Sequence, residues 1–138
     1  MQCAHVPVCL RLQEIRNVGQ VCCAAAQVLH DAGLVHRDFR EPNVVSLAPG
    51  KFMVIDLEMA AEADQVVPAD FILNGWDNST LDSKRRYSRM SDMYLIGCML
   101  GVMGEGRLDE QACQFVASLK AKELTAAAAL AHPYIVGR

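Results

Sequence analysis

The residues that could carry chemistry gather in one polar stretch, HRDFREPN, at positions 36–43. It holds an acid, Asp38, a cation, Arg40, and a carboxamide, Asn43, and a second acid, Asp56, ends an apolar run further along the chain. If a hairpin folds that run back, two carboxylates and an amide oxygen converge, and such oxygens are ligands suited to Mg²⁺. With a cation for phosphate added, these are the parts of phosphoryl transfer, which depends mostly on positioning and charge neutralisation.

The elements that must position these residues are a long helix and a short hairpin. Apolar residues recur every three or four positions, which predicts an amphipathic helix over 11–33 that ends at Gly33. The runs VVSL and KFMVIDL flank Ala48-Pro49-Gly50, a sequence typical of a tight turn between antiparallel strands. The polar loop and the hairpin therefore occupy 34–57, directly after the helix.

The remainder of the chain predicts a long loop and then helices. Residues 58–90 lack periodicity and are expected to form a long ordered loop. A helix is expected to begin near Ser91 as its N-cap, and its body, MYLIGCMLGVM, is apolar on every side and should be buried all round. Two more helices are predicted at about 109–120 and 125–132, the second ended by Pro133.

Composition bounds the class of protein. The 138 residues suffice for one domain or part of a larger one, and 52% hydrophobic against 21% charged residues excludes a disordered chain. The net charge of −3 gives no general attraction to nucleic acid or membrane surfaces. No two of the six cysteines have C-x-x-C spacing, and the longest apolar run has 11 residues, against roughly 20 for a membrane span. We expect a soluble cytoplasmic protein with an irregular lead-in, 1–10, that is not a signal peptide.

Four motifs in one order resemble the protein kinase superfamily. HRDFREPN is similar to its catalytic loop, and VIDLE to the strand and metal-binding Asp of its D-F-G motif. YSRMSDMYLIG resembles the start of the large buried helix of the C-terminal lobe, and LTAAAALAHPYI resembles the end of many kinase domains. The resemblance implies a protein kinase-like C-lobe over 1–138, mainly α with a small β-hairpin (α+β), with the terminal helices in 91–138.

The resemblance also implies roles for single residues. Asp38 would be the base that accepts the substrate hydroxyl proton, and Arg40 would contact phosphate. ATP and Mg²⁺ would be the cofactors, with the metal held by Asn43 and Asp56, and with Val45 and Ile55 under the adenine.

The resemblance gives supporting roles to four neighbours. Asp92 would hydrogen-bond the backbone of the catalytic loop, and Arg37 would pair with a phosphate on the activation segment if one is added there. His36 and Leu57 would belong to the internal hydrophobic stack. His30 is interpreted as a helix-end residue without a functional role.

The sequence also departs from the family pattern. No Gly-rich loop or V-A-I-K-type lysine precedes the first helix, so the N-terminal lobe is absent from this chain. D-F-G is replaced by Asp56-Leu57-Glu58, and no A-P-E motif follows. Three functions stay open: a protein kinase C-lobe of Ser/Thr type that is inactive in isolation, a pseudokinase-like protein-binding module, or a small-molecule phosphotransferase of aminoglycoside or choline kinase type.

The expected partners follow from the same reasoning. A protein substrate or partner is expected, and nucleic acid and membrane are not. The surface near Val45, Ile55 and the start of the first helix should expose an apolar patch, which predicts self-association.

Overall fold

The computed structural model describes residues 4–5 and 10–137, so most of the predicted lead-in lies outside the described residues. The fold is α+β, and its helices are α1 (Leu12–Asp31), α2 (Arg89–Met103), α3 (Glu110–Lys120), α4 (Ala126–Leu130) and α5 (Pro133–Val136). A 3-10 turn, η1, covers Glu41–Asn43. The strands are short and pair antiparallel.

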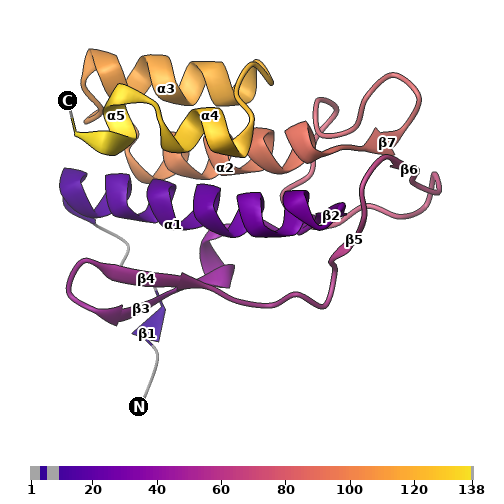
Figure 1. Cartoon of the computed structure of the whole chain (residues 1–138), viewed down its shortest axis with the longest axis horizontal. Helices are drawn as coiled ribbons and strands as arrows, with labels where there is room; N and C mark the ends of the chain where they lie inside the picture. Colours follow the sequence, from indigo (N-terminus) through magenta and orange to yellow (C-terminus); the bar gives the residue numbers. More distant parts are fainter. Residues whose placement is uncertain (1–3, 6–9, 138) are drawn as a thin grey trace.

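The helices form layers on one side of a small sheet. In Figure 1 the sheet lies below α1, while α2 and then α3 and α4 lie above it. The contacts agree, since α1 packs on α2, α4 and strand β4, and α2 packs on α3. The loop between the 3-10 turn and α1 therefore lies where the sheet meets the helical layer.

Helix α1 is the amphipathic helix that the periodicity predicted. Its apolar face is buried, and Gly33 follows its end at φ 77°, in the left-handed region that glycine adopts without steric cost. The adjacent Cys22 and Cys23 are both buried, and burial raises the pKa of both thiols, that of Cys23 to about 12. These cysteines are therefore packing residues of the core.

The predicted hairpin is formed by β3 (Val44–Ala48) and β4 (Lys51–Val54). Gly50 has φ 74° in the turn between them, which follows Pro49 as the sequence indicated. A third strand, β1 (Ala4–His5), pairs with the other edge of β3. The lead-in was predicted to be irregular, so the prediction is wrong at these two residues.

Helix α2 begins three residues earlier than predicted. Ser88 is its N-cap, and Ser91 lies in the first turn, where its Oγ accepts the Ser88 N–H (3.1 Å). From Ser91 to Leu100 the helix is buried except at the half-buried Cys98, but Val102 near its end is 71% exposed, so burial all round is wrong for the last turn. No described helix combines the length and apolar character that crossing a bilayer requires.

The segment between the hairpin and α2 is held at both ends by two-residue strands that the sequence did not predict. Strand β2 (Leu34–Val35) pairs with β5 (Ala61–Glu62), and β6 (Gln65–Val66) pairs with β7 (Arg86–Tyr87). These pairs place the segment against the polar loop and the start of α2.

The last helices are defined by their caps. Asp109 caps α3 through Ala112 N (2.8 Å), and Thr125 caps α4 through Ala128 N (3.1 Å). Pro133 was predicted to end the last helix, but it is the first residue of α5, where its missing N–H is harmless.

Candidate functional site

Three of the predicted site residues are joined by hydrogen bonds. Arg40 Nε donates to Asp38 Oδ1 (2.8 Å), and Asn43 Nδ2 donates to Asp38 Oδ2 (2.7 Å). The same Asn43 nitrogen donates to the Asp38 carbonyl (2.8 Å). Asp38 and Asn43 are both buried, so these bonds are made in a low-dielectric environment where they fix the side-chain orientations.

The Asn43 amide is oriented by this arrangement. Its nitrogen is engaged with Asp38, which directs its oxygen away from Asp38. The amide oxygen, which the sequence predicted as a metal ligand, is not the atom that bonds Asp38.

The hairpin brings the backbone before Asp56 to the same loop. Ile55 N–H donates to the Asn43 carbonyl (2.8 Å), and the His36 ring contacts the Ile55 carbonyl through Nε2 (3.2 Å). The Asp56 side chain itself is exposed, and its Oδ1 accepts the Glu58 N–H (3.3 Å). Asp56 thus directly follows a residue whose backbone is bonded to Asn43, and its own carboxylate has no hydrogen bond to Asp38 or Asn43.

Asp92 is the hub that holds the loop. It is fully buried, and its two carboxylate oxygens accept the backbone N–H groups of His36 (2.9 Å) and Arg37 (3.0 Å). They also accept the Tyr87 hydroxyl (2.6 Å) and contact His30 Nε2 (2.8 Å). The predicted contact from Asp92 to the loop backbone is present, and His30 has more than the helix-end role that the sequence indicated.

The Arg37 backbone is held from both sides. Its N–H is bound by Asp92, and its carbonyl accepts the Trp76 Nε1–H (2.8 Å). Arg37 has φ 72° and Asp56 has φ 67°, both in the left-handed region that costs a non-glycine residue about 1 kcal/mol. The hydrogen bonds around Arg37 offset that cost and fix the direction in which Asp38 leaves the loop.

The Arg37 side chain contacts the segment 58–88, which lies between the hairpin and α2. Its Nε donates to the Met59 carbonyl (2.5 Å), and its guanidinium lies over the Phe71 ring, 4.9 Å from the centroid. Trp76 packs edge-on against Phe71 and stacks on Tyr87 at 5.2 Å. These contacts are with a neutral carbonyl and an aromatic ring, and the pairing of Arg37 with an added phosphate stays a prediction.

The remaining predicted residues differ in exposure. Val45 is only 4% exposed and Ile55 is half-buried, but large apolar side chains near them and at the start of α1 are exposed, namely Leu12 (48%), Leu47 (40%), Met53 (41%) and Leu57 (59%). His36 is buried and stacks on Phe39 at 4.5 Å, but Leu57 is 59% exposed and is not part of an internal stack.

The donor chemistry fits a hard cation. Among the described residues, no group of three or more His, Cys, Asp or Glu side chains is placed to hold a metal ion. The predicted set is different, since it combines the amide oxygen of the buried Asn43 with the carboxylate of the exposed Asp56. In nucleotide sites Mg²⁺ is held by only a few protein oxygens, and water and phosphate supply its other ligands.

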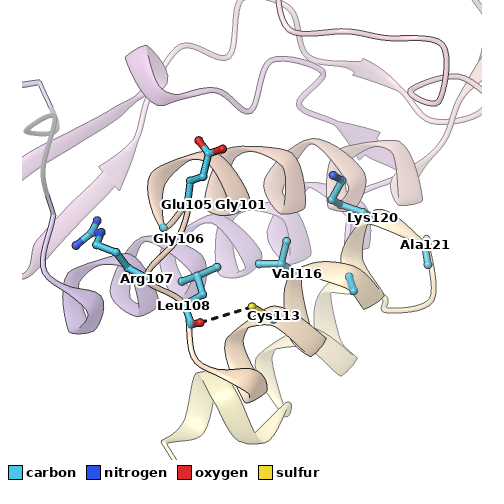
Figure 2. Close-up of a pocket in the computed structure, with 11 residues that line it drawn as sticks. Gly101, Glu105, Gly106, Arg107, Leu108, Cys113, Val116, Lys120 and Ala121 are labelled. Carbon is cyan, nitrogen blue, oxygen red and sulfur yellow. Dashed lines mark hydrogen bonds between the residues drawn. The ribbon is translucent and has the colours of Figure 1, made fainter.

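Two pockets lie on different sides of α2. One of about 810 Å³ lies between the end of α2, the 104–108 loop and α3, with Glu105 and Lys120 at opposite ends (Figure 2). None of the sequence-predicted site residues lines it. A smaller pocket, about 250 Å³, adjoins Arg40 and the last turns of α2. Only the smaller pocket is part of the candidate site.

Sequence reasoning missed three residues of the site. His30, Trp76 and Tyr87 all act on the loop, two of them through Asp92 and one through the Arg37 carbonyl. Trp76 is the single tryptophan, in a segment otherwise rich in turn formers, and this was the one available signal.

Comparisons with known proteins indicate a relationship to protein kinases. The chain is 27% identical over 97 residues to the serine/threonine-protein kinase PAK mbt of Drosophila melanogaster, covering 68% of this chain and 15% of that protein. It is 26% identical over 117 residues to the probable cell division protein kinase of Encephalitozoon cuniculi (strain GB-M1), covering 70% of this chain and 37% of that protein. No family model matches the chain. The chain therefore spans well under half the length of these relatives and is kinase-like in sequence.

Proposed function

We propose that this chain is a protein kinase-like C-lobe whose 36–56 region contributes to transfer of the ATP γ-phosphate to a protein hydroxyl. The observation that carries the proposal is the Asn43 amide, whose nitrogen holds Asp38 through both its carbonyl and its carboxylate. The similarity to serine/threonine kinases supports the same assignment.

Each residue of the site has a role in this proposal. Asp38 accepts the proton of the attacking hydroxyl, and its orientation is set by Asn43 and Arg40. Arg40 places a cation beside the transferred phosphate. Asn43 and Asp56 are the ligands for Mg²⁺, which when bound neutralises phosphate charge. In this proposal Val45, in β3, and Ile55, which follows β4, are the residues under the nucleotide base.

The test is Mg²⁺-dependent binding of ATP, followed by thermal unfolding. At about ten times the dissociation constant, ATP with Mg²⁺ should stabilise the chain by about 1.4 kcal/mol, and ATP alone should do much less. Asp56→Asn should abolish the Mg²⁺-dependent part. Asp82→Asn removes the same charge from another exposed aspartate and should leave the shift intact. A wild-type chain without the shift, or a shift retained by Asp56→Asn, contradicts the proposal.

A second candidate function is a kinase-like binding module without catalysis. It is favoured by the fact that both Asp38 carboxylate oxygens already accept hydrogen bonds, from Arg40 and Asn43. Glu58 adds a further carboxylate beside Asp56. This candidate predicts no Mg²⁺-dependent shift, so the same experiment separates the two.

A further inference from the structure

A groove along helix α3 lies on a different side of α2 from the candidate site. It measures about 810 Å³ and is bounded by the end of α2, the 104–108 loop and α3 (Figure 2). Leu108 and Val116 are half-buried in its lining and give it an apolar floor. None of the candidate site residues lines this α2–α3 groove, so the proposed function does not account for it.

Helix α3 presents a row of small residues to the groove. Cys113, Ala117 and Ala121 all line it, and all three are exposed. They follow one another at intervals of four residues, so they lie on one face of α3 and of its C-terminal end. Because packed helix axes are about 8–10 Å apart according to the side chains between them, small residues allow the closest approach. The α2–α3 groove can therefore receive a second helix alongside α3.

The groove also carries opposite charges at its two ends. Glu105 lies at the end where α3 begins and Lys120 at the end where it finishes, and both side chains are exposed. Their surroundings have the same signs, since residues 105–110 hold three acids and one arginine, and residues 120–123 hold two lysines and one glutamate. Neither Glu105 nor Lys120 forms an ion pair with another described residue, so both charges are available to a partner.

Opposite charges at the two ends make the groove complementary to a second copy of itself. When a two-fold axis crosses α3 near its middle at right angles, two copies of α3 run antiparallel, and the same surface is used by both copies. The acidic end of each copy then meets the basic end of the other. A parallel pair would bring like charges together at both ends, which costs free energy. The charge pattern therefore selects a second copy, in antiparallel orientation, as the occupant.

We propose that this chain forms a symmetric dimer in which α3 of each copy lies in the α2–α3 groove of the other. Glu105 of each copy faces Lys120 of the second copy, so the same ion pair is made twice. The two copies of Ala117 meet at the two-fold axis, because Ala117 is the middle residue of the row Cys113, Ala117 and Ala121. The proposal goes beyond phosphoryl transfer and holds whether or not the chain binds ATP.

The first test is sedimentation of the full chain over a range of concentrations. Wild type should show a monomer–dimer equilibrium. Lys120→Glu alone and Glu105→Lys alone each place like charges together at both ends of the dimer, so each should raise the dissociation constant about tenfold or more. The double variant exchanges the two charges and should recover the wild-type dissociation constant. Lys84→Glu makes the same charge change at another exposed lysine and should have no effect.

The second test is a disulfide at the proposed two-fold axis. Two cysteines form a disulfide when their Cα atoms lie about 5.5–6 Å apart, a separation that close antiparallel helices reach only near the axis. In a Cys113→Ser background, Ala117→Cys should therefore give a covalent dimer on mild oxidation. Ala128→Cys is the matched control, since Ala128 is exposed on α4 and does not line the groove, and it should give no more covalent dimer than the background.

Three results would overturn the proposal. The first is a wild-type chain that stays monomeric up to about 1 mM. The second is a dimer whose dissociation constant changes no more with Lys120→Glu than with Lys84→Glu, or is not recovered in the double variant. The third is a dimer that survives both charge reversals but is lost on Met53→Lys, because Met53 is 41% exposed on β4 and such a dimer would form through the sheet.

Discussion

Replacing Asp92 by asparagine tests whether one buried carboxylate holds the polar loop, residues 36–43, in place. Asp92 accepts hydrogen bonds from two backbone N–H groups, those of His36 and Arg37, and contacts Tyr87 and His30. Burial, followed by the nearby Asp92 charge, raises the pKa of Tyr87 well above its ordinary value, so its hydroxyl stays protonated and remains a donor. Asparagine keeps the shape but exchanges one acceptor for a donor.

The magnitude follows from which donors can adapt. If the new NH₂ faces Tyr87, the hydroxyl can rotate to accept it, but the Arg37 N–H loses its acceptor. If it faces His30, the ring can accept in its other tautomer, but the His36 N–H is left without a partner. Either way one backbone N–H is left without an acceptor, which costs about 1–3 kcal/mol. The remaining hydrogen bonds are made to a neutral amide instead of a carboxylate and are weaker, so we expect the free energy of unfolding to fall by about 2–4 kcal/mol in total.

The assay is urea unfolding followed by the fluorescence of Trp76, which is bonded to the same loop. At about 3 °C per kcal/mol for a chain of this size, the melting temperature should also fall by about 6–12 °C. Asp82→Asn is the control, because Asp82 also accepts two backbone N–H groups but is exposed, so water can replace it. A loss below about 1 kcal/mol for Asp92→Asn would refute the view that this carboxylate fixes the loop.

Two further predictions concern the helices around the site. Although burial opposes it, hydrogen bonds from Tyr94, Ser79 and Thr80 lower the pKa of Asp77, so its contribution to stability is present above about pH 3.9 and is lost as pH falls through the folded-state pKa. As the pH is lowered, the free energy of unfolding should therefore fall less steeply in Asp77→Asn than in wild type. The same dependence of the free energy of unfolding on pH in both proteins would contradict this. A methyl group at Gly97 would lie 2.9 Å from Leu119 Cβ and 3.2 Å from the Lys120 backbone nitrogen, so Gly97→Ala should cost about 1–3 kcal/mol in urea unfolding. Gly101→Ala meets Val116 at 3.4 Å and should be near neutral, and equal effects would argue against tight α2–α3 packing.

Much of the architecture could be predicted because its signals are local. The apolar period of α1, the Pro49-Gly50 turn and the cap at Asp109 each depend on residues within a few positions of one another. The start of α2 was misplaced because Ser88 and Ser91 are both good N-caps, and only the reciprocal geometry selects the first. The two-residue strands of the 61–87 region depend on distant partners, and so short a run has no periodicity to detect.

The candidate site divides along the same line. Asp38, Arg40 and Asn43 are close in sequence, so their convergence could be predicted from spacing. The contacts of His30 and Trp76 could not, because each is made with a residue far away in the chain. The exposure of Leu57 and the burial of Val45 likewise depend on which strands and layers cover the hairpin, and this is a property of the assembled fold.

The Asp92 hub has a consequence for the order of folding. The carboxylate lies 62 residues from His30, 56 from His36 and 55 from Arg37 along the chain, so closing these contacts requires a long loop to lose its freedom first. During synthesis at the ribosome, α1 and the hairpin can form from local contacts, but the polar loop between them cannot reach its final geometry until residue 92 has been translated and has docked. The polar loop therefore reaches its final geometry only after the start of α2 has docked against it.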